Sequence, residues 1–126
     1  MTFGESISTC LSKYADFGGR AARPEFWWFY LFIAIVNWAL MFTWYASLTD
    51  PLNTGFPPGL IFSFIVGLAT LLPVLAAAVR RLHDTGKSGA AIFISLIPIV
   101  GSIILIVWLA TEGTAGPNQY GEKPAA

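Results

Sequence analysis

The residues best suited to chemistry lie in one polar stretch, residues 80–89, with the sequence RRLHDTGKSG. This stretch contains three of the seven Lys and Arg residues and the single histidine of the chain. A histidine followed by a carboxylate, as in His83-Asp84, is one pattern for proton handling. Asp84 also lies four residues after Arg80, so a local ion pair at a helix end is the simpler interpretation. Contact with a specific ligand is the third alternative.

Enzymatic and nucleotide-binding sites are not indicated by the sequence. Gly86-Lys87-Ser88 looks like the end of a phosphate-binding loop, but that loop requires a glycine where this chain has Arg81. The single Cys10 cannot form an internal disulfide, and Cys and His do not cluster with metal-ligand spacing. No serine stands with a histidine and an acid in a recognisable catalytic motif. We therefore expect no enzymatic activity and no catalytic, cofactor-binding or metal-binding residues.

The polar stretch lies between two long runs without charge, residues 51–79 and 88–111. Hydrophobic residues make up 56% of the 126-residue chain and charged residues only 11%, against roughly 25% in ordinary soluble domains. A soluble domain of this size could not bury so much apolar surface, so the composition predicts a single all-α integral membrane domain. The formal net charge of zero argues against nucleic-acid binding, which requires a cationic excess.

Three uncharged segments predict transmembrane helices. The first has 23 residues, which span roughly 34 Å at the rise of an α-helix. Pro24 and Glu25 suit the first turn of that helix, and Ser88 suits the N-cap of the third. Pro98 and Gly101 indicate a kink within the third helix. The expected spans are 26–48, 59–79 and 89–110, followed by a polar C-terminal tail at 111–126.

The N-terminal residues are expected to form a separate element. Apolar side chains recur at three- or four-residue spacing at Phe3, Ile7, Leu11 and Tyr14. This pattern predicts a short amphipathic helix at 3–17, which lies in the headgroup region or packs against the bundle. A frayed polar tail is the alternative.

The polar residues within the predicted spans carry no charge. A proton-coupled transporter usually needs a carboxylate or histidine inside the membrane, so this pattern argues against that class. Asn37 is expected to bond to a neighbouring helix rather than to a substrate. Gly59, Ser63 and Gly67 form a ridge of small residues that predicts close helix packing and makes a homo-oligomer plausible.

The distribution of Lys and Arg predicts the orientation in the membrane. The first loop contains none, and the C-terminal tail contains only Lys123. The other six lie before the first span or between the second and the third. The positive-inside rule therefore places the N-terminus and the central loop in the cytoplasm and the C-terminus outside.

The cytoplasmic polar residues are the candidate binding site. A basic face near the bilayer attracts anionic phospholipid, and it also offers contacts to a membrane-protein partner. The candidates for these contacts are Arg20, Arg23, Arg80, Arg81, His83, Asp84 and Lys87. A further hypothesis is that Glu25 or Asp84 pairs across helices with one of these arginines, which would lock the first span to the central loop.

Four motifs occur in order along nearly the whole chain: GRAARPEFWWF at 19–29, RRLHDTGKSG at 80–89, IPIVG at 97–101 and GTAGPNQYG at 113–121. Together they resemble the domain-of-unknown-function 805 family of small bacterial inner-membrane proteins. One departure is Ala90-Ala91, where the family often has tryptophans. The resemblance implies a helical, integral protein of the inner (plasma) membrane, and it brings no established activity.

These observations predict a multi-pass membrane protein with a non-enzymatic role. The main expectation is an accessory or binding protein whose cytoplasmic basic face contacts anionic lipid or a membrane partner. The alternative is a subunit of a small oligomeric transporter or channel, in which kinked spans line a path.

Overall fold

The protein is described here from a computed structural model, which covers residues 2–50, 52, 55 and 57–124. All regular elements in this part of the chain are helical, which confirms the all-α class; the remaining pairing is an isolated bridge between Asn118 and Gly121. In chain order the elements are α1 (Phe3–Ser12), α2 (Arg23–Thr49), α3 (Pro58–Asp84), the 3₁₀ helix η1 (Gly89–Leu96) and α4 (Val100–Ala110).

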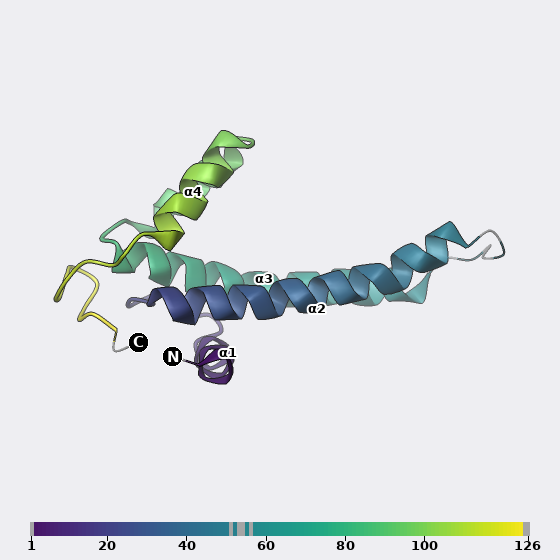
Figure 1. The fold of residues 1–126 in the computed structure, drawn as a ribbon, viewed down its shortest axis with the longest axis horizontal. Helices are drawn as coiled ribbons and strands as arrows, with labels where there is room; N and C mark the ends of the chain where they lie inside the picture. Colours follow the sequence, from purple (N-terminus) through teal and green to yellow (C-terminus); the bar gives the residue numbers. More distant parts are fainter. Residues whose placement is uncertain (1, 51, 53–54, 56, 125–126) are drawn as a thin grey trace.

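Helices α2 and α3 run antiparallel, side by side along their length, and form the long axis of the molecule (Figure 1). Each has 27 residues, which corresponds to roughly 40 Å, and each is long and apolar enough to cross a membrane. They contain the predicted spans 26–48 and 59–79. Both helices have a proline in their first turn, where the missing N–H leaves no hydrogen bond unmade.

Helix α3 extends beyond the predicted span, because it continues through Asp84. Arg80 and Asp84 therefore belong to its last turns rather than to a loop. Only residues 85–88 connect α3 to the next element, and Ser88 caps that element by accepting a hydrogen bond from the Ala90 N–H, as predicted.

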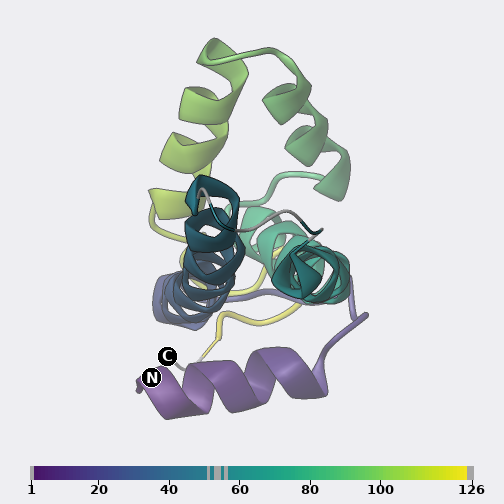
Figure 2. The same ribbon diagram turned by 90° about the vertical axis from the view of Figure 1, so that its right-hand side faces the viewer.

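The third predicted span, 89–110, does not form one continuous helix. The segment divides into η1 and α4, which pack against each other as a hairpin (Figure 2). At the rises of a 3₁₀ helix and an α-helix, each arm is roughly 16 Å long, about half of the hydrocarbon thickness. Neither arm alone can cross a bilayer. We call η1, α4 and the connection between them the apolar hairpin.

The sequence of the connection explains why the helix turns back instead of only kinking. Pro98 has no N–H to continue a helix, and Ile99 adopts a positive φ of 63°, which a β-branched residue rarely does. Gly101 then lies so close to the carbonyl oxygen of Ile94 that any side chain would overlap it. The sequence analysis assigned Pro98 and Gly101 to a kink, whereas the structure places them at a reversal of the chain.

Helix α1 crosses the α2/α3 pair at a steep angle, on the side opposite the apolar hairpin (Figures 1 and 2). Thr2 caps it by accepting from the Glu5 N–H, and Phe3 packs edge-on against Trp28. The side chains of Ser6 and Cys10 contact the carbonyl oxygen of Glu25 in α2. The helix ends at Ser12, before the predicted boundary at 17, and it is packed on the bundle.

The core lies at one end of the molecule rather than along its length. Its buried apolar members are Cys10, Phe26, Phe29, Ala77, Ala78, Leu82 and Leu109. Toward the other end large apolar side chains are exposed, and Phe42 and Phe64 each have 68% of their surface accessible. Such an apolar surface is the type that lipid covers.

The predicted small-residue ridge of Gly59, Ser63 and Gly67 lies beside α2 within the same molecule. A Cβ at Gly59 would approach the Thr43 hydroxyl to 3.1 Å, and one at Gly67 would lie 3.7 Å from the Asn37 amide oxygen. Close helix approach at this ridge is therefore used internally, and self-association through it remains a prediction.

Candidate functional site

Five charged side chains are buried together at the end of the α2/α3 pair where α2 begins and α3 ends (Figure 1). None of them has more than 6% of its surface exposed. They come from the approach to α2, from its first turn and from the last two turns of α3. We call this group the buried charge cluster, and its members are Arg20, Glu25, Arg80, Arg81 and Asp84.

Asp84 is the centre of the cluster because both of its oxygens bind a guanidinium. Its Oδ1 accepts from Arg20 at 2.8 Å, and its Oδ2 accepts from Arg81 at 2.5 Å. The predicted local pair with Arg80 is therefore wrong. Asp84 is three residues after Arg81, on the same side of α3, whereas Arg80 points toward a different helix.

Arg80 pairs with Glu25 in α2, with 3.2 Å between Nη1 and Oε1. The hypothesis that Glu25 or Asp84 pairs across helices with an arginine is confirmed for Glu25, whereas Asp84 binds Arg81 of its own helix and Arg20, which precedes α2. The Nη2 atom of Arg80 lies 3.9 Å from the Cys10 sulfur. The Nε atom of Arg80 has no hydrogen-bond partner among the described residues. Arg80 thus joins α1, α2 and α3.

The arginines also hold the C-terminal segment, residues 111–124, through its backbone. Arg20 donates to the carbonyl oxygens of Thr114 at 2.6 Å and Gly116 at 2.7 Å. Arg81 donates to Leu109 O at 2.8 Å and also to Thr111 O. Multiple carbonyl acceptors satisfy the donors that a buried guanidinium would otherwise leave unpaired.

These bonds correct the predicted position of the C-terminal segment. It was expected on the side of the membrane opposite the N-terminus, but the Thr114 N–H donates to the Asp84 carbonyl oxygen at 2.7 Å. Gly113 packs onto the Asp84 carboxylate with no room for a side chain. Because the apolar hairpin starts and ends at the same end of α3, the chain returns to where it left. Lys123 therefore lies at the same end of the α2/α3 pair as the other six Lys and Arg residues.

His83 is engaged by the C-terminal segment rather than by Asp84. Its Nδ1 donates to the Gly19 carbonyl oxygen at 3.0 Å, and its ring stacks on Tyr120 with the centroids 3.8 Å apart. Asn118 donates to the His83 carbonyl oxygen at 2.9 Å. The structure does not bring His83 and Asp84 together as a proton-handling pair, so the geometry favours a packing role for the histidine.

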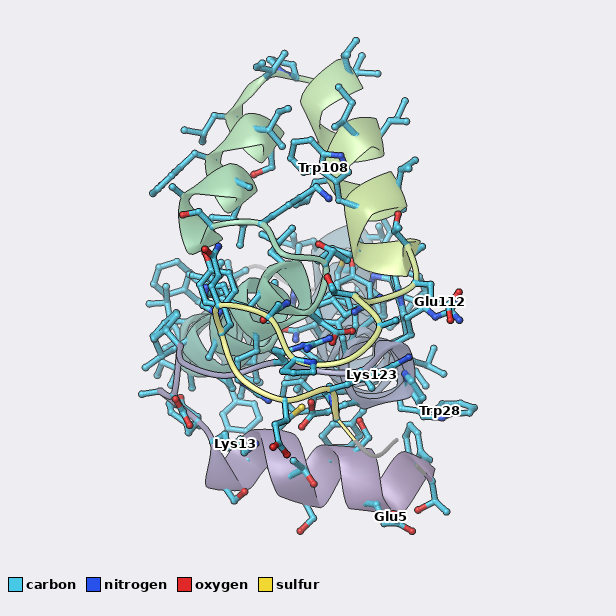
Figure 3. All side chains as sticks on the ribbon, turned by 90° about the vertical axis from the view of Figure 1, so that its left-hand side faces the viewer. Glu5, Lys13, Trp28, Trp108, Glu112 and Lys123 are labelled. Atoms are coloured by element: carbon cyan, nitrogen blue, oxygen red, sulfur yellow. The ribbon has the colours of Figure 1, made fainter. Side chains whose placement is uncertain are left out.

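The remaining basic candidates lie outside the buried charge cluster. Arg23 is exposed, and Lys87 is half-buried with its ammonium group 5.4 Å from the centre of the Trp108 ring. Lys123, which was not among the candidates, is exposed in the C-terminal segment (Figure 3). None of the three forms an ion pair within the described part of the chain. The predicted basic face therefore divides into arginines used internally and cations available to the surroundings.

Sequence reasoning missed the contribution of the C-terminal segment. Tyr120, Asn118 and Gly113 contact α3, although they lie about thirty residues away in the chain. The one signal was the GTAGPNQYG motif, whose small and turn-forming residues allow a backbone to approach a buried site closely. That motif contributed to the family resemblance but was not assigned a structural role.

Cys10 lies at the edge of the cluster. Burial, and secondarily the negative charge of Glu25, raises the pKa of the Cys10 thiol above its ordinary value, while Arg80 acts in the opposite direction. A raised pKa keeps the sulfur as a neutral thiol, which is a weak nucleophile.

Two cavities adjoin the cluster. A polar cavity of about 260 Å³ lies between the start of α2 and the C-terminal segment, lined in part by Arg23, Asp84, Glu112 and Lys123. An apolar cavity of about 240 Å³ lies between α2 and the apolar hairpin. Within the described residues no group of three His, Cys, Asp or Glu side chains could hold a metal ion.

Together these features define an all-helical membrane protein in which two long apolar helices are joined at one end by buried ion pairs. Comparison with known families gives the particular assignment. The chain belongs to the family described as "Protein of unknown function (DUF805)", which matches residues 14–122. The resemblance derived from the four sequence motifs is thereby confirmed.

Two relatives in Escherichia coli strain K12 support this assignment. The chain is 42% identical to inner membrane protein YhaI over 114 residues, which cover 90% of each chain. It is 38% identical to inner membrane protein YhaH over 116 residues, which cover 90% of this chain and 91% of the relative. No solved structure matches the chain.

Proposed function

We propose that this chain is a non-enzymatic accessory protein of the bacterial inner membrane, whose cytoplasmic end contacts anionic phospholipid or a membrane-protein partner. Its relatives are inner-membrane proteins, and its two long apolar helices suit the same location. The observation that carries the proposal is a charge asymmetry. All seven Lys and Arg residues belong to segments at one end of the α2/α3 pair, whereas the loop between these helices has none.

The same asymmetry sets the proposed orientation. Both terminal segments and residues 85–88 lie in the cytoplasm, α2 and α3 cross the bilayer, and the apolar hairpin enters from the cytoplasmic side and returns. The connection of the hairpin suits an apolar surrounding because its backbone is partly satisfied internally. The Val100 N–H donates to Pro98 O, and the Gly101 N–H donates to Ile97 O.

Cysteine labelling with a membrane-impermeant maleimide tests this orientation. Leu52→Cys should react in cells with a permeabilised outer membrane, and Lys123→Cys should react only after the inner membrane is broken. The wild-type chain is the control because its Cys10 is buried. Reaction of Lys123→Cys before lysis would place the C-terminal segment outside and reject the proposed orientation.

Contact with anionic lipid depends on where individual Lys and Arg side chains are exposed, because the net charge of this end of the protein is small. Six of the seven carboxylates share the basic end, all except Asp50, so seven cations face six anions and the formal excess there is one positive charge. Three arginines are also occupied internally. Four cations remain for external contact: Lys13, at the end of α1, and Arg23, Lys87 and Lys123.

Tryptophan quenching by brominated lipids measures the lipid preference directly. Brominated phosphatidylglycerol should quench the protein in vesicles more strongly than brominated phosphatidylcholine. Replacement of Arg23, Lys87 and Lys123 with Gln should reduce the difference strongly, because about 1 kcal/mol of attraction is lost for each basic residue near a charged surface. Equal quenching of the wild-type protein by both lipids would reject lipid contact as the role of this face.

A protein partner is tested by site-specific photocrosslinking in living cells. Ala90 is an exposed probe position beside the basic end, whereas Leu82 is fully buried and Gly86 has a φ of 80° that disfavours a side chain. A discrete protein adduct would identify the partner and define an accessory subunit. The alternative of a transporter or channel subunit remains a prediction, which solute flux in liposomes lost on Asn37 substitution would favour.

A further inference from the structure

The polar and apolar cavities are lined by neighbouring residues of α2, and their opposite wall passes from the apolar hairpin into the C-terminal segment. Pro24 lines the polar cavity, and Phe26 and Trp27, in the same turn of α2, line the apolar one. On the opposite wall Leu109 lines the apolar cavity, and Glu112, one turn later, lines the polar one. A molecule that filled both would have a polar end at the cytoplasmic surface and an apolar part beside the membrane helices.

The charges around the polar cavity favour an anion. Arg23 and Lys123 line it, and neither forms an ion pair in the described part of the chain. Asp84 also lines it, but Arg20 and Arg81 already neutralise this carboxylate. Glu112 is the remaining acid. Four cations therefore stand against two carboxylates, an excess of two positive charges.

The apolar cavity determines what kind of anion fits. It is bounded by aromatic side chains of α2 on one side and by the apolar hairpin on the other, and its surface is mostly apolar although Ser95, Ser102 and Tyr30 contribute hydroxyl groups to the lining residues. A free phosphate ion would leave this space unfilled, whereas an acyl chain would cover it. At a bilayer surface, such chains come attached to phosphate headgroups.

We propose that a single anionic glycerophospholipid of the cytoplasmic leaflet binds between α2 and the apolar hairpin. Its phosphate lies in the polar cavity against Arg23 and Lys123, and one acyl chain lies in the apolar cavity. This inference rests on the proposed lipid-contacting function and makes it specific, because it replaces a general surface attraction with one site. The Glu112 carboxylate would repel a second negative charge on the headgroup, so the site favours a headgroup with a single negative charge.

Native mass spectrometry of the full-length protein counts retained lipids and measures their affinity. The probes are dioleoyl phosphatidylglycerol, dioleoyl phosphatidylcholine and inorganic phosphate. One phosphatidylglycerol should be retained, and Arg23→Gln or Lys123→Gln should weaken its binding about fivefold each. Glu112→Gln should strengthen it by a similar factor, an opposite change that misfolding cannot produce. Lys13→Gln, at the end of α1 and outside both cavities, is the matched control without effect.

A second pair of variants tests the acyl-chain position. Ser102→Trp should fill the apolar cavity and abolish lipid retention, whereas Ile103→Trp, on the same helix but outside the cavity, should leave it unchanged. Equal retention of phosphatidylcholine, competition by inorganic phosphate alone, or no effect of Ser102→Trp would each overturn the site. If Ser102→Trp has no effect while the quenching preference persists, the site fails and the general lipid-contacting function stands.

Discussion

The two ends of the α2/α3 pair are built on different principles. At the end that contains the buried charge cluster, five buried charges join the approach to α2, α2 itself, α3 and the C-terminal segment. At the far end α2 and α3 are the only regular elements in the described part of the chain, and their large apolar side chains are exposed. The contrast indicates that one end is specified by directional polar contacts within the chain, and the other by two long helices with an outward apolar surface.

Equivalent substitutions at the two ends should therefore change the free energy of unfolding by different amounts. Removal of one partner from a buried ion pair leaves a desolvated charge, which typically costs about 3–5 kcal/mol. At the far end, the Thr43 and Thr49 hydroxyls donate to carbonyl oxygens of their own helix, so their loss leaves no buried charge without a partner. The predictions below test this difference in decreasing order of expected effect.

Asp84→Asn should have the largest effect, because it leaves two buried guanidiniums without a counter-charge. We expect the unfolding free energy to fall by about 5 kcal/mol, at the upper end of the range for broken buried pairs. Denaturant unfolding in detergent micelles measures the change. Asp50→Asn, at the far end and exposed, is the matched control, and an equal loss in both variants would contradict the comparison.

Separate charge changes at Glu25 and Arg80 should each destabilise the protein by about 3 kcal/mol. The exchanged double variant, Glu25→Arg with Arg80→Glu, should recover part of this loss because it restores opposite charges at the same contact. The double-mutant cycle isolates the pairing from other effects of each substitution. A double variant that loses the full sum of the single losses would show that these two residues do not interact.

Gly113→Ala tests whether the C-terminal segment is locked to the cluster. A methyl group there would overlap the Asp84 carboxylate, so we expect a loss of about 2 kcal/mol from overpacking. Limited proteolysis should then cleave residues 111–124 faster. Gly4→Ala is the control, since a Cβ at Gly4 meets nothing within 4 Å. Unchanged protection in Gly113→Ala would mean that the segment is not packed against Asp84.

Asn37→Val should have the smallest effect. The Asn37 amide donates to the Thr70 hydroxyl of α3 at 3.4 Å, a long bond between the two membrane helices. Polar contacts of this kind contribute about 0.6 kcal/mol on average, so the variant should remain folded with a barely measurable loss. A thermal-unfolding shift comparable to that of Asp84→Asn would show that the membrane-buried part also depends on directional polar contacts.

The rate at which Cys10 is alkylated reports whether the buried charge cluster is intact. Burial raises the pKa of its thiol, so at pH 7–8 the native protein should react slowly with iodoacetamide, a reagent that requires the thiolate. Opening of the buried charge cluster would expose the sulfur and lower its pKa toward the ordinary value. Asp84→Asn should therefore label faster than wild type, whereas Asp50→Asn should not.

Much of the helical architecture could be predicted from the sequence. Uncharged runs long enough to cross a bilayer specify α2 and α3, since helix formation there satisfies every backbone group locally. Pro24 and Ser88 marked helix starts, because their effects act within one turn. The same local reasoning placed Glu25 or Asp84 near an arginine, because buried acids need a counter-charge.

What the sequence alone determined was therefore the two long helices, the membrane environment and the end at which the charges gather. Only the tertiary structure decided that Asp84 binds Arg20 and Arg81, that Arg80 binds Glu25, and that the apolar hairpin turns back. An apolar run of 22 residues is compatible with one span or with two short arms. The choice depends on contacts far away in the chain, such as the Arg81 bond to Leu109 O, and local sequence patterns do not encode such contacts.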